Sequence, residues 1–186
     1  PSRQIAMGRQ PFVSRRHRYF IKHRAHRPQP GAAAVRPLSI RCPESHRKES
    51  AQQVILVDSS VWIDFFRGQE TAAVEQLAEL LDEAAAPVAI ADLALFEVLR
   101  GFRHEHDYVA ADSVMRALDV IAIGGDAICR AAAQHYRELR ARGVTIASPI
   151  DVLQATYCIE HNHALLHNDR DFDAMESLRG LKVWRH

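Results

Sequence analysis

The feature that most constrains this chain is a short apolar run, residues 54–57 (VILV), which stops abruptly at Asp58. The run contains no polar alternation, which is typical of a parallel strand that is covered on both faces. It therefore predicts a buried strand with Asp58 at its carboxyl end. Open α/β sheets bind their ligands at that end, although an aspartate before a helix is most often a cap that satisfies free backbone amides.

A helix is expected directly after Asp58. Ser59 or Ser60 can cap its first turn, and Gly68 can end it in a left-handed conformation. Trp62, Phe65 and Phe66 recur at helical spacing, so we expect them in the core rather than in a surface for stacking RNA bases.

Helices and strands alternate along the rest of the chain. Asp92, Asp126 and Ser148 are the expected caps of three helices, and Pro149 suits the first position of the last of these. The remaining predicted elements are helix 71–85, strand 88–91, helix 92–101, helix 107–118, strand 120–123, helix 126–143, helix 148–162, strand 164–167, a short helix to 178 and strand 181–184. This alternation predicts an α/β protein whose central parallel sheet of four to five strands has helices on both faces.

Charge divides the chain into two parts. Residues 1–53 contain 12 Lys or Arg and 2 Asp or Glu, a balance of +10. The other 133 residues contain 12 basic and 21 acidic side chains, a balance of −9. We therefore expect a basic, disordered extension at residues 1–53 and one globular domain at residues 54–186.

Three explanations compete for the basic extension. It is an arm that binds nucleic acid phosphates, an ordinary solvated tail, or translated sequence upstream of the true start. The apolar pattern begins cleanly at Val54, and valine can be encoded by an alternative start codon, which favours the third explanation.

Cysteine usage and hydropathy both indicate a cytoplasmic protein. The three cysteines, Cys42, Cys129 and Cys158, are odd in number and lie in dissimilar settings, which does not suit a disulfide framework. No stretch approaches the roughly 20 apolar residues of a membrane span, and no apolar signal-peptide core is present near residue 1.

Four carboxylates are expected at one edge of the predicted sheet. Asp58 and Asp169 follow strands, and Glu97 and Asp151 lie in the first turns of helices that lead away from the same edge. Each alone is explained by capping or by a solvated or hydrogen-bonded acid, but four at one edge are jointly harder to explain in this way. Uncompensated carboxylates in one cleft repel each other, so the arrangement favours a divalent cation. Oxygen-only ligands suit Mg²⁺ or Mn²⁺ better than Zn²⁺, and such a site hydrolyses phosphate esters.

These residues lie in four ordered motifs that resemble those of PIN-domain ribonucleases, specifically VapC-type toxins of bacterial toxin–antitoxin pairs. The motifs are VDSSVWID (57–64), FEVLRG (96–101), IDVL (150–153) and LLHNDRDF (165–172). The resemblance covers residues 54–186 and implies a three-layer α/β/α fold, Mg²⁺-dependent endoribonuclease activity, a homodimer and a VapB-like antitoxin that blocks the site.

The resemblance also implies roles for individual residues. Asp58, Glu97, Asp151 and Asp169 are the expected acidic site and metal residues, and Asp171 is a supporting acid. Ser60 matches a hydroxyl that orients Asp58. Two departures stand out: Gln154 lies where the family more often has an aliphatic residue, and the basic extension has no counterpart.

Other residue patterns favour structural roles. Cys158, His161 and His163 have a spacing that suits zinc, but no second ligand pair accompanies them, so packed or solvent-facing roles are expected. Arg100 and Arg103 are either RNA-phosphate contacts or solvated side chains, and we expect the latter.

The leading hypothesis is therefore an Mg²⁺-dependent endoribonuclease that acts as a toxin on tRNA, mRNA or rRNA. A PIN-domain nuclease of RNA maturation and a non-catalytic RNA-binding protein that uses the basic extension are the alternatives.

Overall fold

The computed structural model describes residues 53–83 and 86–185, so the expectations for the basic extension lie outside its described part, apart from Gln53. A parallel sheet with strand order β3-β2-β1-β4-β5 forms the centre. Its strands are β1 (Ile55–Val57), β2 (Val88–Ala91), β3 (Asp119–Ile121), β4 (Ala164–Leu166) and β5 (Lys182–Val183).

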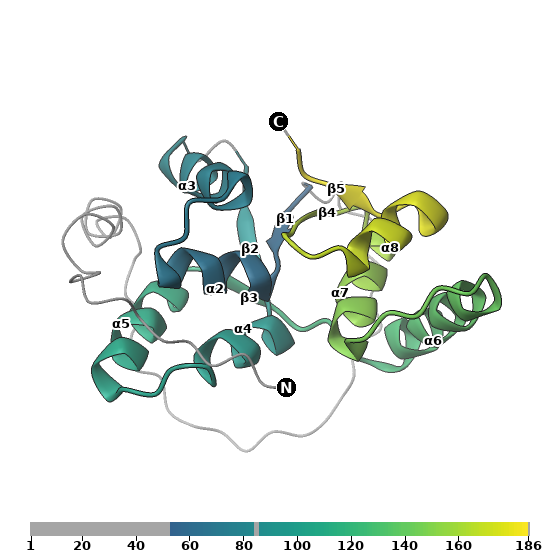
Figure 1. Ribbon diagram of the computed structural model, residues 1–186, viewed down its shortest axis with the longest axis horizontal. Coiled ribbons are helices and arrows are strands. Elements are labelled where there is room, and N and C mark those ends of the chain that lie inside the picture. Colours follow the sequence, from purple (N-terminus) through teal and green to yellow (C-terminus); the bar gives the residue numbers. More distant parts are fainter. Residues whose placement is uncertain (1–52, 84–85, 186) are drawn as a thin grey trace, which may run out of the picture.

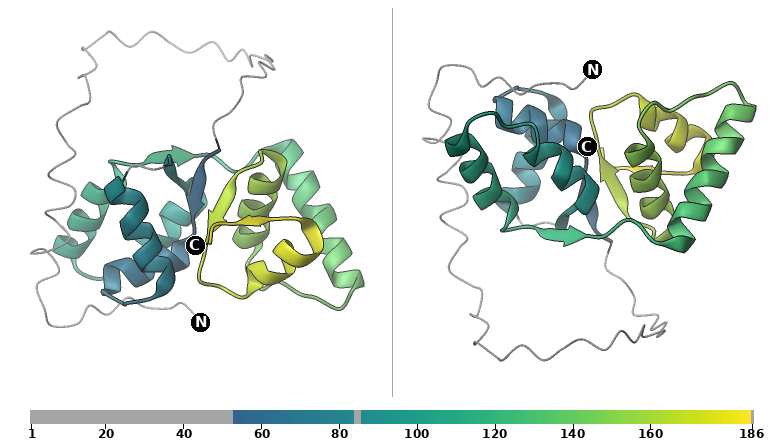
Figure 2. Two further views of the ribbon diagram at one scale, coloured as in Figure 1. Left: turned by 90° about the horizontal axis from the view of Figure 1, so that it is seen from above. Right: turned by 90° about the horizontal axis from the view of Figure 1, so that it is seen from below.

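Helices cover both faces of this sheet, which confirms the expected α/β class (Figures 1 and 2). One face is covered by α2 (Ser59–Arg67), α3 (Ala72–Glu83), α4 (Asp92–Leu99) and α5 (Glu105–Met115). The other face is covered by α6 (Asp126–Ala141), α7 (Pro149–Glu160) and α8 (Asp171–Arg179), which pack against one another. The chain changes faces between β3 and β4, so β1 and β4 are neighbours whose following helices lie on opposite faces.

The apolar run identified in the sequence is the central strand. Ile55, Leu56 and Val57 are all 1% exposed or less, because helices cover them from both sides. The backbone amide of Asp58 still bonds to the carbonyl of Leu166 at 2.9 Å, so β1 and β4 stay paired up to the point where Asp58 leaves the sheet.

Aromatic side chains of α2 form part of the core, as expected. Trp62 and Phe66 are buried, and their rings stack with centroids 6.3 Å apart. Phe66 also meets Phe102 edge to face at 5.5 Å, which connects α2 to the segment after α4. Burial of rings of this size is a major source of stability.

The prediction for the third strand was wrong by about two residues. β3 is an edge strand that pairs only with β2, and that pairing ends at the Ala91–Ile121 partners because α4 begins at Asp92. Ile123 therefore has no strand partner; instead, its amide donates to Asp92 Oδ1 at 3.3 Å.

Three predicted caps were also wrong. The cap of α2 is Asp58 itself rather than Ser59 or Ser60, and Ala91 and Gly125 precede α4 and α6 in place of Asp92 and Asp126. By contrast, Ser148 caps α7 with Pro149 in its first turn, and Gly68 ends α2 with φ of 72°, both as expected. Within the described residues, no helix is long and apolar enough to cross a membrane.

Candidate metal-dependent nuclease site

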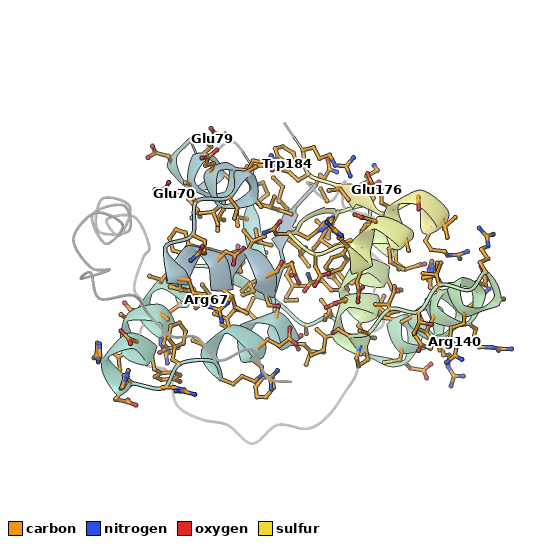
Figure 3. All side chains as sticks on the ribbon, in the orientation of Figure 1. Arg67, Glu70, Glu79, Arg140, Glu176 and Trp184 are labelled. Carbon is orange, nitrogen blue, oxygen red and sulfur yellow. The ribbon has the colours of Figure 1, made fainter. Side chains whose placement is uncertain are left out.

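The crevice between the ends of β1 and β4 is where a ligand site is expected, because the strand order reverses there. Asp58 leaves β1 on one side, and Asp169 follows β4 on the other. Glu97 lies in α4, after β2, and Asp151 lies in the first turn of α7. In contrast, the labelled Glu70, Glu79 and Arg140 of Figure 3 are exposed at the periphery.

Asp58 is the most firmly held of the four acids. Its side chain is 3% exposed, and each of its carboxylate oxygens accepts a hydrogen bond. The backbone amide of Ser60 donates to Oδ2 at 2.8 Å, and Gln154 Nε2 donates to Oδ1 at 3.1 Å. Asp58 is therefore both the helix cap that the simplest reading suggests and a fixed carboxylate at the crevice.

Glu97 is connected to Asp58 through the start of α2. The hydroxyl of Ser59 donates to Glu97 Oε2 at 2.9 Å. Partial burial raises the pKa of Glu97, the Ser59 hydrogen bond opposes that rise, and the charge of Asp58 adds to it. Glu97 thus shares an electrostatic environment with Asp58 although it comes from a different helix.

The pKa of Asp151 is raised by burial and by the charges of all three other acids. Burial raises its pKa from 3.8 to about 7, with further contributions from the charges of Asp58, Glu97 and Asp169. A side-chain hydrogen bond with Ser148 acts in the opposite direction. Asp151 therefore lies close enough to each of the other three predicted acids to be affected by its charge.

The loop after β4 is fixed from both layers. Asp169 Oδ1 accepts from the amide of Asp171 at 3.0 Å, which orders the start of α8. Asp171 Oδ2 accepts from the amide of Ala147 at 2.9 Å, directly before the Ser148 cap of α7. Asp171 thus contacts the backbone that leads to Asp151.

Ser60 contacts Asp58 in a different way from the expected one. Its hydroxyl accepts from the amide of Asn168 at 3.2 Å, and only its backbone amide bonds to Asp58. The side chain of Asn168 in turn donates to Asp64 Oδ2 at 3.0 Å. Ser60 therefore holds the β4 loop against α2, next to the crevice.

Comparison with known proteins identifies the family. Residues 55–178 match the family described as PIN domain. Ribonuclease VapC11 of Mycobacterium tuberculosis and a VapC ribonuclease of Mycobacterium bovis are each 30% identical over 130 residues, which cover 70% of this chain and 97% of theirs. The chain belongs to the PIN-domain family, among its VapC-type members.

Solved structures support the same PIN-domain fold. VapBC2 from Rickettsia felis, bound to a DNA fragment from their promoter, aligns with a TM-score of 0.58 and 16% identity, covering 72% of this chain and all of that one. VapBC-1 from nontypeable Haemophilus influenzae aligns with a TM-score of 0.56 and 17% identity, covering 71% and 97%. At these identities the likeness concerns the fold.

Two residues of this PIN domain that contact the acids were missed as site residues. Ser59 appeared only as a cap, and Gln154 only as an unexpected polar group on a packed helix face. The available signal for Gln154 was its place three residues after Asp151, on the same side of α7. For Ser59, no local signal distinguishes a capping hydroxyl from one that reaches another helix.

The donor set of this PIN domain fits a hard divalent cation. All four acids offer carboxylate oxygens, and among the described residues no Lys, Arg or His forms an ion pair with any of them. Within that part of the chain, no three His, Cys, Asp or Glu side chains gather closely enough to hold an ion together. Mg²⁺ needs only one or two direct carboxylates and keeps several waters, so the remaining acids suit contacts through water.

The zinc pattern does not form a site. Among the described residues no three His, Cys, Asp or Glu side chains gather around an ion position, and Cys158 is fully buried with the pKa of its thiol raised by that burial to about 12. His161 instead stacks on Tyr157 with ring centroids 4.0 Å apart. The expected packed role of these residues fits this arrangement.

Arg100 is exposed, which fits the solvated role expected for it. Its Cζ lies over the Phe96 ring, 5.4 Å from the ring centroid.

Proposed function

We propose that this protein is an Mg²⁺-dependent endoribonuclease that acts in the cytoplasm as the toxin of a toxin–antitoxin pair. The observation that supports it most is the setting of Asp151, a buried carboxylate that lies within the influence of three other acids and that no basic side chain in the described residues neutralises. Such a group is at its most stable when a cation binds it. The ribonuclease names of the curated relatives support the choice of RNA as substrate.

The acids divide into two proposed roles. Asp58 and Asp151 hold Mg²⁺ or Mn²⁺, since both are buried and the carboxyl group of each has a hydrogen-bond partner, Gln154 for Asp58 and Ser148 for Asp151. When bound, the cation supplies charge neutralisation at the scissile phosphate and acidifies water. Glu97 and Asp169 complete the site and orient the attacking water.

Glu97 is the proposed proton acceptor of that second pair. Ser59 occupies its Oε2, so Oε1 remains to accept the proton from water. Its raised pKa brings its basicity nearer to neutral pH, which suits a general base. Attack by this water on phosphorus, in line with the leaving 3′ oxygen, leaves a 5′-phosphate product.

Cleavage of a mixed pool of tRNA and single-stranded RNA by the full chain tests this proposal. The arms are Mg²⁺, Mn²⁺, EDTA, and Asp58→Asn in Mg²⁺. Asparagine is also a good cap, so α2 remains capped and Gln154 can turn its amide to meet the new side chain. Discrete cuts are expected with either cation, and none with EDTA or with the variant.

Asp126→Asn is the matched control. Asp126 is an exposed acid at the start of α6 and pairs with Arg130 at 2.9 Å, away from the crevice. This variant should cleave at the wild-type rate. Cleavage that persists in EDTA, or in purified Asp58→Asn, would refute the proposed site.

Toxin activity needs a separate test in cells. The similar solved structures from Rickettsia felis and Haemophilus influenzae are of VapBC2 and VapBC-1, which supports a VapB-like antitoxin as the partner of this chain. The proposed toxin is a homodimer. Induced expression should arrest growth, and co-expression of a small neighbouring gene should relieve it. Cleavage in vitro without growth arrest would favour RNA maturation, and salt-sensitive binding without turnover would favour a non-catalytic RNA-binding protein.

A further inference from the structure

Gln154 is a polar side chain in a fully buried position. It is 0% exposed, and it lies on α7 between Asp151, three residues earlier, and Cys158, four residues later. Both of these residues lie near Asp58, because the charge of Asp58 raises the pKa of Asp151 and of Cys158. This face of α7 therefore lies against the end of β1.

The amide of Gln154 completes the fixation of Asp58. Its Nε2 donates to Oδ1 at 3.1 Å, while the amide of Ser60 donates to Oδ2 at 2.8 Å. These donors come from α7 on one face of the sheet and α2 on the other. Each carboxylate oxygen thus has one donor, Oδ1 from α7 and Oδ2 from α2, and a rotation of the carboxylate would break both bonds.

The other end of the same amide is unpaired. Gln154 Oε1 is buried and has no hydrogen-bond partner among the described residues. A buried acceptor without a partner destabilises a fold, and an apolar side chain of similar length would avoid this. Packing therefore does not explain glutamine here, whereas the contact to Asp58 does.

A neutral donor has a particular advantage beside a cation site. It orients a carboxylate without cancelling the negative charge that attracts the cation, which Lys or Arg would do. We propose that Gln154 is a positioning residue that fixes the orientation of Asp58 toward the cation and its placement relative to Asp151. This inference rests on the function proposed above.

The test compares Gln154→Met with the wild-type full chain. Methionine matches the length of glutamine but has no N–H donor. Mn²⁺ affinity is measured from the EPR signal of free Mn²⁺, thermal stability by circular dichroism, and RNA cleavage by separate kcat and KM values. Gln154→Leu repeats the test if the methionine variant does not fold.

Thr156→Val is the matched control. Thr156 is also fully buried on α7, and its hydroxyl likewise has no partner within the described part of the chain. Removal of the orphan hydroxyl in Thr156→Val should leave the melting temperature unchanged or raise it. Gln154→Met also removes the donor to the buried Asp58 Oδ1, so it should lower the melting temperature while the variant stays folded at the assay temperature. Only Gln154→Met should weaken Mn²⁺ binding, by about 10- to 100-fold, and lower kcat with KM for RNA unchanged.

Two results would overturn the inference while the proposed function stands. One is an active wild type with a methionine variant of equal Mn²⁺ affinity and kcat. The other is a loss of affinity that matches the unfolded fraction of the variant, since this is a purely structural effect. A wild type that neither binds Mn²⁺ nor cleaves RNA would overturn the proposed function, and this inference with it.

Discussion

The hydroxyl of Ser59 donates to Glu97 Oε2 at 2.9 Å and thereby joins the first turn of α2 to α4. This contact brings an acid from the β2 side of the sheet toward the crevice beside β1. The hydrogen bond also stabilises the charged form of Glu97 and so lowers its pKa. Burial and the charge of Asp58 act in the opposite direction, and the pKa is raised as a result.

Ser59→Ala should therefore raise the pKa of Glu97 further. If Glu97 accepts a proton from water, the acidic limb of the pH–rate profile will move to higher pH, and the fold will lose about 1 kcal/mol. Ser177→Ala is the control, because the Ser177 hydroxyl bonds only to the carbonyl of Asp173. An unchanged pH profile would remove Glu97 from the role of base.

The stability of the metal-free protein should fall as pH rises toward neutrality. The pKa of Asp151 is about 7 in the folded state, against 3.8 for an ordinary aspartate, so the folded state binds this proton more tightly between those values. Stability is then lost progressively from about pH 4 to about pH 7, by about 4 kcal/mol at most for a shift of this size. Urea unfolding in EDTA across this range measures the slope, and Asp151→Asn should flatten it. An equal slope in the variant would show that other groups cause it.

Mg²⁺ should stabilise the fold more at pH 8 than at pH 5.5. Above its raised pKa, Asp151 is charged and free to bind the cation; below it, the proton competes. The rise in melting temperature upon addition of Mg²⁺, measured at both pH values, checks this. Asp126→Asn should behave like wild type, and Asp58→Asn should lose the effect.

Asp171 should support the site through the backbone rather than by its charge. Its Oδ2 accepts from the amide of Ala147, and asparagine can accept the same bond. Asp171→Asn should therefore keep most of the cleavage rate, whereas Asp171→Ala should lose about 1 kcal/mol of stability and part of the rate. If asparagine abolishes cleavage as fully as it does at position 58, then Asp171 acts as a fifth acid of the site.

Cys158 should resist alkylation in the native protein. Its thiol is buried and protonated, whereas Cys129 is exposed. Iodoacetamide followed by peptide mass spectrometry should find Cys129 modified first, and Cys158 modified only in denaturant. Rapid native labelling of Cys158 would mean that α7 separates from β1.

The order of elements and the place of Asp58 at the carboxyl end of the first strand were predictable because they depend on local patterns. A continuous apolar run ending in Asp58 predicted a buried parallel strand, and Ser148-Pro149 predicted the start of α7; both are confirmed. The end of β3 was not predictable from its own residues, since it depends on where its partner β2 stops.

Contacts across the crevice were beyond the reach of local patterns. The periodicity of α7 shows which face is buried, but it does not show that Asp58 lies opposite Gln154. Similarly, the position of Ser60 suggested a hydroxyl contact to Asp58. In the structure the backbone amide of Ser60 makes that contact, and its hydroxyl accepts a hydrogen bond from the amide of Asn168.

The central position of β1, between β2 and β4, has a consequence for protein synthesis. The hydrogen bond from Asn168 to Ser60 joins positions 108 apart, and that from Gln154 to Asp58 joins positions 96 apart. Contacts of such long range form late in folding, and they lower the folding rate of the chain. A chain still emerging from the ribosome holds Asp58 and Glu97 long before α7 and β4 exist, so it has no assembled site. Any hydrolytic activity that needs these acids together must therefore wait until α7 and the segment after β4 have been synthesised.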